Sequence, residues 1–151
     1  FPNRANAFQF DTDTRNIFIC ADSKRLLSAF LELLSNAAEA DNSCGSIQIH
    51  SHVNACGHTV TVSVTGKGSL SEINPSEMQT NPLIDADAPL TAQLSTPFFS
   101  TKENHAGLGL SIVAQVCHTH HAGFELYSRN GFTTAGITFP ILAMDDVCNT
   151  I

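Results

Sequence analysis

Residues 22–40, DSKRLLSAFLELLSNAAEA, carry the longest regular pattern of this 151-residue chain. Apolar side chains recur three or four positions apart, as in a helix that buries one stripe. The stripe comprises Leu26, Phe30, Leu33, Leu34 and Ala37. Asp22 and Ser23 are favourable N-cap residues, and residues 42–45 (NSCG) interrupt the pattern. The stretch therefore predicts a long amphipathic helix that ends at about residues 39–41.

Strand-like patterns lie on both sides of this helix. Residues 7–11 and 16–20 are short extended runs with a turn-like TDTR between them, which predicts a hairpin. Alternating apolar residues predict two strands after the helix, around residues 47–49 and 60–64. The sequence from Gly107 to about His121 has the pattern of a second helix.

A closing hairpin and the order of the elements decide the expected fold class. Residues 124–128 and 132–142 form the hairpin, which turns at an Asn-Gly pair. Strands grouped in neighbouring pairs favour a mixed, mostly antiparallel sheet with helices on one face. We therefore expect an α/β two-layer sandwich in one domain, residues 1–143, followed by a tail at residues 144–151. Residues 69–106 lack periodicity, which is typical of a functional or mobile loop.

Composition narrows the class of protein. Apolar residues make up 42% and charged residues 14%, which is typical of a globular domain. The formal net charge of −7 argues against duplex DNA or an anionic membrane as a partner. The chain begins with Phe1 and carries no leader pattern, which indicates a piece of a longer protein.

Cysteines and histidines are candidates for metal or redox chemistry. The five cysteines are an odd number without a C-x-x-C pair, so a reducing compartment is favoured over a disulfide framework. In residues 117–121 (CHTHH), Cys117 and His121 would share a helix face that could hold a metal ion. The stronger interpretation is a helix end, because Gly123 follows closely and histidines favour the last turn. His50 and His52 are expected as a solvated pair on one strand face.

Two motifs carry groups suited to a cation or a closely approaching ligand. Glu32, Asn36 and Glu39 fall at i, i+4 and i+7 on one polar helix face. An amide oxygen flanked by carboxylates could ligate Mg²⁺, although a solvated polar stripe has the same pattern. Residues 66–68 (GKG) end a strand, where glycines allow a tight turn or the close approach of a ligand.

Two further motifs suit an anion. They are residues 97–102 (PFFSTK) and residues 107–113 (GLGLSIV). Glycines that open a helix leave its first N–H groups available to an anion, and the helix dipole adds to the attraction. Lys102 can add a point charge. The spacing fits neither a Walker loop nor a dinucleotide fingerprint.

In their order and spacing, the four motifs resemble the ATP-binding domain of sensor histidine kinases, within the GHKL ATPase superfamily. Residues 32–40 look like its N box, and residues 64–68 (VTGKG) look like its first glycine box. Residues 97–102 look like the phenylalanine box, and residues 107–113 look like the second glycine box. The resemblance spans roughly residues 7–141. It implies a Bergerat-type sandwich that holds ATP between the long helix and a mobile lid, residues 69–106.

The resemblance also implies roles for individual residues. Asn36 would ligate Mg²⁺, while Glu32 and Lys102 would act in phosphoryl transfer, with Lys102 close to the phosphates. Gly66 and Gly68 would line the adenine end, and the N–H groups of the second glycine box would face the phosphates. The implied nucleotide contacts are Asn36, Glu39, Ala40, Val64, Gly66, Gly68, Thr101, Lys102, Gly107, Leu108, Gly109 and Leu110.

Three positions depart from the family pattern. Val64 stands where the first glycine box begins with an Asp that accepts a hydrogen bond from adenine. It also continues the apolar face of Val60 and Val62, as an ordinary core residue would. His105 stands where the second glycine box opens with one more Gly. Glu32 is often Asn in sensor kinases, but its position is that of the general base in gyrase-type ATPases.

The function implied is that of the ATP-binding catalytic domain of a two-component sensor histidine kinase. It would phosphorylate a histidine on the helical dimerisation domain of the same kinase, outside this chain, for relay to a response regulator. The full protein would be a homodimer, and this domain would lie in the cytoplasm without direct contact to membrane or nucleic acid. One alternative is a degenerate docking module of a phosphorelay that binds nucleotide weakly or not at all. A gyrase-type ATPase is the third, prompted by Glu32 and opposed by the phenylalanine box.

Overall fold

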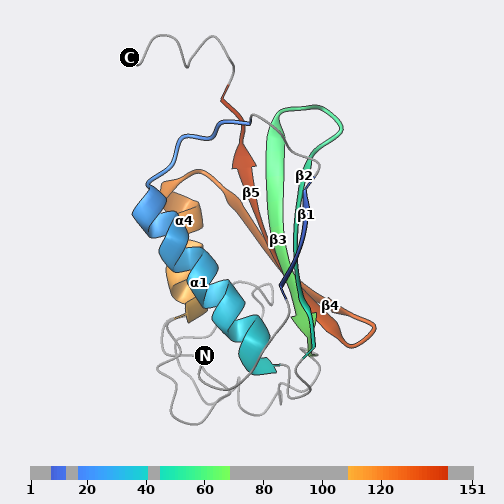
Figure 1. Ribbon diagram of the computed structural model, residues 1–151. Coiled ribbons are helices and arrows are strands. Elements are labelled where there is room, and N and C mark those ends of the chain that lie inside the picture. Colours follow the sequence, from blue (N-terminus) through green and yellow to red (C-terminus); the bar gives the residue numbers. More distant parts are fainter. Residues whose placement is uncertain (1–7, 13–16, 41–44, 69–108, 143–151) are drawn as a thin grey trace, which may run out of the picture.

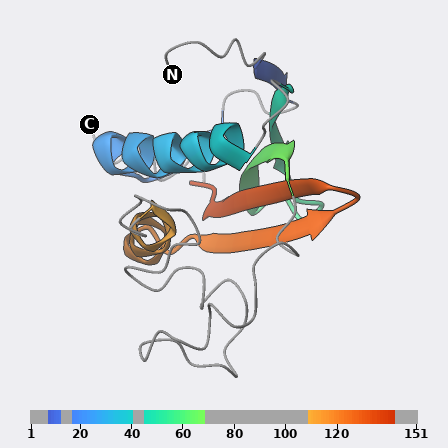
Figure 2. The same cartoon turned by 90° about the horizontal axis from the view of Figure 1, so that it is seen from below.

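The computed structural model describes residues 8–12, 17–40, 45–68 and 109–142. The elements are β1 (Phe8–Thr12), α1 (Ser23–Ala40), β2 (Ile47–Val53), β3 (Thr59–Lys67), α4 (Gly109–Thr119), β4 (Gly123–Arg129) and β5 (Phe132–Pro140). The sheet has the order β1-β2-β3-β5-β4, with β1 parallel to β2 and the other neighbours antiparallel. Both helices cover the same face of the sheet (Figures 1 and 2). The predicted two-layer α/β sandwich with a mixed, mostly antiparallel sheet is confirmed.

The hydrophobic core lies between the two helices and the face of the sheet that they cover. Its buried side chains include Ala29 and Leu33 of α1, Val113, Val116 and Cys117 of α4, Val60 and Val64 of β3, and Ala135, Ile137 and Phe139 of β5. Burial raises the pKa of the Cys117 thiol from its ordinary value of 9.0 to about 11. This thiol is therefore a protonated core group at neutral pH and an unreactive one.

The other face of the sheet is polar, as expected of an antiparallel sheet with one solvated side. On it, the hydroxyl groups of Thr61 and Thr138 are hydrogen-bonded at 2.8 Å across β3 and β5. His50 and His52 lie on β2 with stacked rings, their centroids 5.5 Å apart. The Nδ1 atom of His50 is 3.4 Å from Oδ2 of Asp11, which links β2 to β1. The expected histidine pair on one strand face is thus present, and it is half-buried.

The first predicted hairpin is wrong. Residues 17–22 form no strand, and β1 instead pairs in parallel with β2, so that Phe8 lies beside Ile47. The segment before α1 runs along the end of β5, where the backbone N–H of Leu142 donates to the carbonyl of Phe18 at 2.9 Å. Ile17 and Ile19 pack on the core from this segment. Tertiary packing therefore overrides an alternating pattern that suits a strand locally.

The predicted bounds of the long helix are confirmed. The Asp22 carboxylate caps α1, because its Oδ1 atom accepts hydrogen bonds from the backbone N–H groups of Lys24 at 2.9 Å and Arg25 at 3.1 Å. These bonds hold the pKa of Asp22 below its ordinary value, with the bond from Arg25 as the largest cause. No helix of the described residues is long and apolar enough to cross a membrane.

The second helix and the closing hairpin match the prediction, with a shorter helix end. Helix α4 stops at Thr119, since His121 has a φ of 51°, in the left-handed region that ends a helix. The imidazole Nδ1 of His120 is 2.7 Å from the carbonyl of Val116, as the helix-end interpretation of these histidines predicts. Strands β4 and β5 turn at Asn130 and Gly131, whose φ angles of 54° and 77° suit a type I′ turn.

Several predictions lie outside the described residues. They concern the lid at residues 69–106, the tail at residues 144–151, and the contacts assigned to Thr101, Lys102, Gly107 and Leu108. The departure at His105 lies outside them as well.

Candidate functional site

Two polar side chains of α1 face the first residue of α4. A Cβ atom on Gly109 would lie 2.7 Å from Oε2 of Glu32 and 3.5 Å from Nδ2 of Asn36. Both side chains are half-buried. A larger residue at this position would require the end of the Glu32 side chain to move. The structure thus places Glu32 and Asn36 of the first motif beside Gly109, the first described residue of the motif at residues 107–113.

The start of α4 and the face of α1 offer complementary charges. The first four N–H groups of an α-helix have no acceptor within the helix, and the dipole makes that end positive. Gly109 and Leu110 supply the first of these groups in α4. The Glu32 carboxylate and the Asn36 amide lie opposite, and their oxygens are the ligands that hard cations prefer. This arrangement can hold an anion and a cation next to each other.

Glu39 and Ala40 lie farther along the same helix and are exposed. The hydroxyl of Ser35 donates to Oε1 of Glu39 at 2.9 Å, one turn away. The Glu39 carboxylate is therefore held along the helix surface, whereas Glu32 and Asn36 are turned toward α4. Of the three residues on the predicted polar face, Glu32 and Asn36 therefore point toward α4, and Glu39 does not.

The glycines at the end of β3 bring this strand close to the last turns of α1. A Cβ atom on Gly66 would lie 2.9 Å from the Cβ of Ala37, and one on Gly68 would lie 3.1 Å from the Cβ of Ala40. The backbone N–H of Gly68 also donates to the carbonyl of Gly131, at 2.9 Å, in the β4–β5 turn. The glycines are therefore required by close contact between strand and helix, which holds the end of β3 next to the N-box residues.

Val64 is a core residue of β3. It is 2% exposed and lies between Ile49 of β2 and Ala135 of β5 on the covered face of the sheet. An apolar side chain offers no acceptor to a polar ligand. The reading of Val64 as an ordinary core residue is therefore confirmed, and it lies two residues before the glycine that touches α1.

Sequence reasoning missed two residues of this arrangement. The sequence pattern places Ala37 only in the buried stripe, although its small side chain is what lets Gly66 approach α1. The pattern places His120 only at the helix end, although its ring also contacts the residue that caps α1. A signal for Ala37 exists in the sequence, since small residues on a helix often mark close approach. The contact of His120 spans 98 positions and has no local signal.

Comparison with known proteins identifies the family. The family of histidine kinase-, DNA gyrase B- and HSP90-like ATPases matches residues 21–143, which include α1, β3 and α4. The chain belongs to this family of ATPases.

Individual relatives indicate which type of protein within this family the chain resembles. The chain is 33% identical over 127 residues to the sensory histidine kinase/phosphatase NtrB of Rhizobium leguminosarum bv. phaseoli, covering 81% of this chain and 32% of the relative. It is 28% identical over 120 residues to NtrB of Rhodobacter capsulatus, covering 80% and 33%. The chain thus spans about a third of the length of these curated relatives.

Solved structures agree with these relatives. The catalytic domain of the histidine kinase ThkA, in a nucleotide-free form, has a TM-score of 0.66 and 28% identity to this chain. The match covers 89% of this chain and 78% of the ThkA domain. This ATPase-family chain is therefore an ATP-binding catalytic domain of the two-component sensor histidine kinase type.

Proposed function

We propose that this domain binds Mg²⁺-ATP and transfers the γ-phosphoryl group to a histidine on a helical dimerisation domain outside the chain. The observation that carries the proposal is the meeting of Glu32 and Asn36 with Gly109 at the start of α4. In the transfer, an imidazole nitrogen forms a bond to the γ-phosphorus while the bond to the bridging oxygen breaks and ADP leaves. Such a reaction asks the protein mainly to position the phosphates and to neutralise charge.

Each residue of the site would have a distinct role. The N–H groups at the start of α4, from Gly109 and Leu110, would hold phosphate oxygens, as helix N-termini do. Asn36 would ligate the metal ion through its amide oxygen, Oδ1. Glu32 would accept the proton that the acceptor imidazole loses. Lys102 would approach the phosphates from outside the described residues.

The site fits a magnesium ion on two grounds. Its side-chain donors are a carboxylate and an amide, both oxygen ligands of the kind that Mg²⁺ takes. The space beside them is kept open by a glycine whose Cβ would meet Glu32. When bound, the ion would neutralise charge on the transferred phosphoryl group. The remaining nucleotide contacts would come from Glu39, Ala40, Gly66, Gly68, Thr101, Gly107 and Leu108.

The partners of the whole protein are part of the same proposal. Because the chain spans about a third of its curated relatives, the acceptor histidine and the dimer contacts would lie in the remainder of the protein. A response regulator would take the phosphoryl group from that histidine. The domain would work in the cytoplasm, where ATP is present and thiols stay reduced.

The competing function is a docking module that keeps the fold without binding nucleotide. Buried Val64 favours it, since this residue gives no acceptor for the amino group of adenine. The loss of a hydrogen bond to a charged acceptor corresponds to about 1.5–3 kcal/mol, so ATP affinity would fall without vanishing. A gyrase-type hydrolase, with Glu32 activating water, is the third function.

Calorimetric titration with a non-hydrolysable ATP analogue, with and without Mg²⁺, tests the proposal. We expect binding that depends on Mg²⁺ in the wild type and is lost in Asn36→Ala. Ser28→Ala is the matched control, because Ser28 is an exposed residue of the same helix whose hydroxyl donates to the carbonyl of Lys24 at 3.2 Å. Absence of binding in the wild type would favour the docking module. Release of inorganic phosphate from ATP by the domain alone, lost in Glu32→Gln, would favour the hydrolase.

A further inference from the structure

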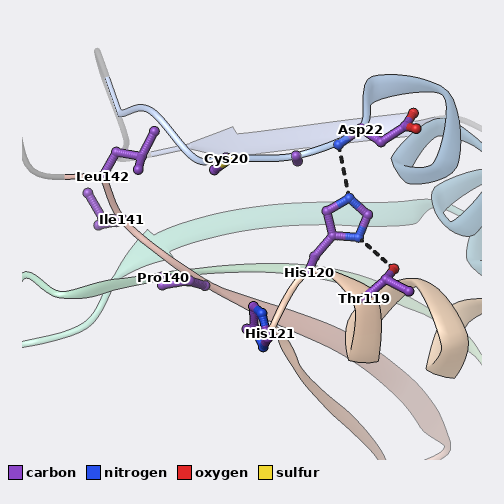
Figure 3. A pocket seen from close by; sticks show the side chains of 9 residues that line it. Cys20, Asp22, Thr119, His120, His121, Pro140, Ile141 and Leu142 are labelled. Carbon is purple, nitrogen blue, oxygen red and sulfur yellow. Dashed lines mark hydrogen bonds between the residues drawn. The ribbon is translucent and has the colours of Figure 1, made fainter. Parts of the chain in front are cut away.

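His120 uses both nitrogens of its imidazole ring, and they contact different helices. Nδ1 lies 2.7 Å from the carbonyl of Val116 in α4, with the hydroxyl of Thr119 at 3.2 Å. Nε2 accepts a hydrogen bond from the backbone N–H of Asp22, at 2.9 Å (Figure 3). Because a backbone N–H can only donate, Nε2 acts as the acceptor of this bond, and a proton on Nδ1 would satisfy the contact with the Val116 carbonyl.

The bond to Asp22 supplies an acceptor that α1 lacks. In a capping box, the backbone N–H of the N-cap residue is accepted by a Glu or Gln three positions later. Asp22 is the N-cap of α1, and the residue three positions later is Arg25, which carries no acceptor. His120 therefore takes the place of the capping-box acceptor from a different helix, 98 positions away.

The same two helices form the candidate nucleotide site at their other contact. Helices α1 and α4 cross on the same face of the sheet (Figures 1 and 2). Gly109, at the start of α4, lies close to Glu32 of α1, while His120, just after the end of α4, contacts Asp22, just before α1. Helix α4 spans 11 residues, so the two contacts are about 16 Å apart along it. Between them the packing is apolar and includes Leu33 and Val113.

Apolar packing alone leaves the relative position of two helices loosely defined, because it has no directional preference. A hydrogen bond does have one, since it weakens steeply when its angle or length changes. At the other end of α4, a Cβ atom on Gly109 would come within 2.7 Å of Oε2 of Glu32, so the start of α4 lies close to this side chain. The hydrogen bond at the far end therefore bears on the geometry of the site.

We infer that His120 is a positioning residue, which fixes α4 against the N-cap of α1 and so keeps Gly109 in place against Glu32 and Asn36. It acts through the two helices and touches no nucleotide. The inference rests on the proposed function for its effect on nucleotide affinity, but its effect on the helices does not depend on nucleotide.

Two substitutions separate the contact with Asp22 from the local contact. His120→Gln places an amide oxygen near the position of Nε2, so it keeps an acceptor for the N–H of Asp22. His120→Asn is shorter, so its amide can donate to the carbonyl of Val116 but does not reach Asp22. The ring lines a pocket of about 360 Å³ with Cys20 and Leu142, so both smaller side chains fit (Figure 3).

The affinity of each variant for the Mg²⁺ complex of a non-hydrolysable ATP analogue is measured under conditions where all variants are fully folded. We expect His120→Gln to bind as the wild type does. His120→Asn should bind about three- to tenfold more weakly, the range that corresponds to one intramolecular hydrogen bond. Wild-type affinity in both variants would overturn the inference and leave His120 a helix-end residue only.

Asn54→Ala is a control that should lose about as much stability as His120→Asn, but in another part of the domain. Oδ1 of Asn54 accepts hydrogen bonds from the N–H groups of His58 and Thr59 in the β2–β3 turn, away from both helices. This variant should lose stability and keep nucleotide affinity. A matching fall in affinity would show that general destabilisation explains the effect of His120→Asn, which also overturns the inference.

Amide hydrogen exchange keeps the test independent of nucleotide binding. In the free protein, His120→Asn should speed exchange in residues 110–113 of α4, far from the substitution, whereas His120→Gln should not. Exchange that changes only near residues 22–26 and 118–122 would overturn the inference. If the wild type binds no nucleotide, the proposed function fails while this measurement still decides the role of His120.

Discussion

The two ends of the contact between α1 and α4 are held in different ways. At the nucleotide end, glycines bring backbone close to α1, with Gly109 against Glu32 and Gly66 against Ala37. At the opposite end, polar groups meet, with His120 on the N-cap Asp22. A glycine has no side chain that could cover the polar groups of α1, so a ligand can reach them. At the opposite end, the polar groups are hydrogen-bonded to each other. One end of the contact can therefore bind nucleotide, and the other end aligns the two helices.

The largest effect is expected from a charge at the nucleotide end. Val64→Asp puts a carboxylate into a 2%-exposed core position, and we expect a loss of about 3 kcal/mol or more in the free energy of unfolding. If residue 64 faces adenine, ATP binding should tighten by about 1–3 kcal/mol and GTP binding should gain little. Urea unfolding and calorimetry with both nucleotides measure the two effects.

Val64→Asn is the control for charge in this pair of experiments. It should lose less stability, and the loss for Val64→Asp should shrink at low pH, where the new carboxyl becomes neutral. Equal tightening for ATP and GTP would show that residue 64 does not face the base. Such a result would mean that the adenine base does not bind beside residue 64.

A second substitution tests how closely strand β3 approaches helix α1 at the same end. Gly66→Ala would place a Cβ atom 2.9 Å from the Cβ of Ala37 and 3.2 Å from its carbonyl oxygen, so we expect a loss of about 1–3 kcal/mol. Gly136→Ala is the matched control on β5, because its nearest neighbour, Cγ2 of Thr61, is 3.6 Å away. It should change stability little.

The double variant Gly66→Ala with Ala37→Gly sharpens this test. Removing the Cβ of Ala37 relieves the closest contact, so part of the loss should return despite the cost of a glycine in a helix. Chemical denaturation of the wild type, the two single variants and the double variant gives the coupling free energy between the two positions. Additive losses would show that the strand end is not held by this contact.

At the opposite end, acid should remove the helix cap. The pKa of Asp22 is lowered on folding, so its carboxylate stabilises the folded state fully above its ordinary value of 3.8. That contribution is lost as the pH falls from about 3.8 through the lower folded pKa. Asp22→Ala should lower the melting temperature at pH 7, less than Gly66→Ala does, and the difference from wild type should narrow in acid. A difference that stays constant down to pH 2 would contradict the cap.

The smallest effect concerns the residue that ends α4. His121 has a φ of 51°, so His121→Gly should stabilise the fold by about 0.5–1 kcal/mol by removing a Cβ from a left-handed position. His118→Gly, within the last turn of the same helix, should destabilise it instead. Thermal melting compares the pair. A loss of stability in both would mean that the His121 side chain stabilises this end more than its backbone strains it.

Local patterns in the sequence determined a large part of this fold. The buried stripe and the Asp22 cap define α1, and Asn130 with Gly131 defines the turn between β4 and β5. These features depend on neighbours within a few positions, so helical and strand periodicity are enough to predict them. The likeness to a nucleotide-binding family also rested on short motifs, each contained within one segment.

Tertiary structure alone decided how these segments meet. The residues after β1 suited a strand, but the sheet edge was completed by β1 beside β2, and Ile17 and Ile19 packed on the core instead. The close approach of Gly109 to Glu32 and the hydrogen bond from Asp22 to His120 join residues far apart in the chain. No local propensity encodes them, because they result from how the helices fill the space above one sheet.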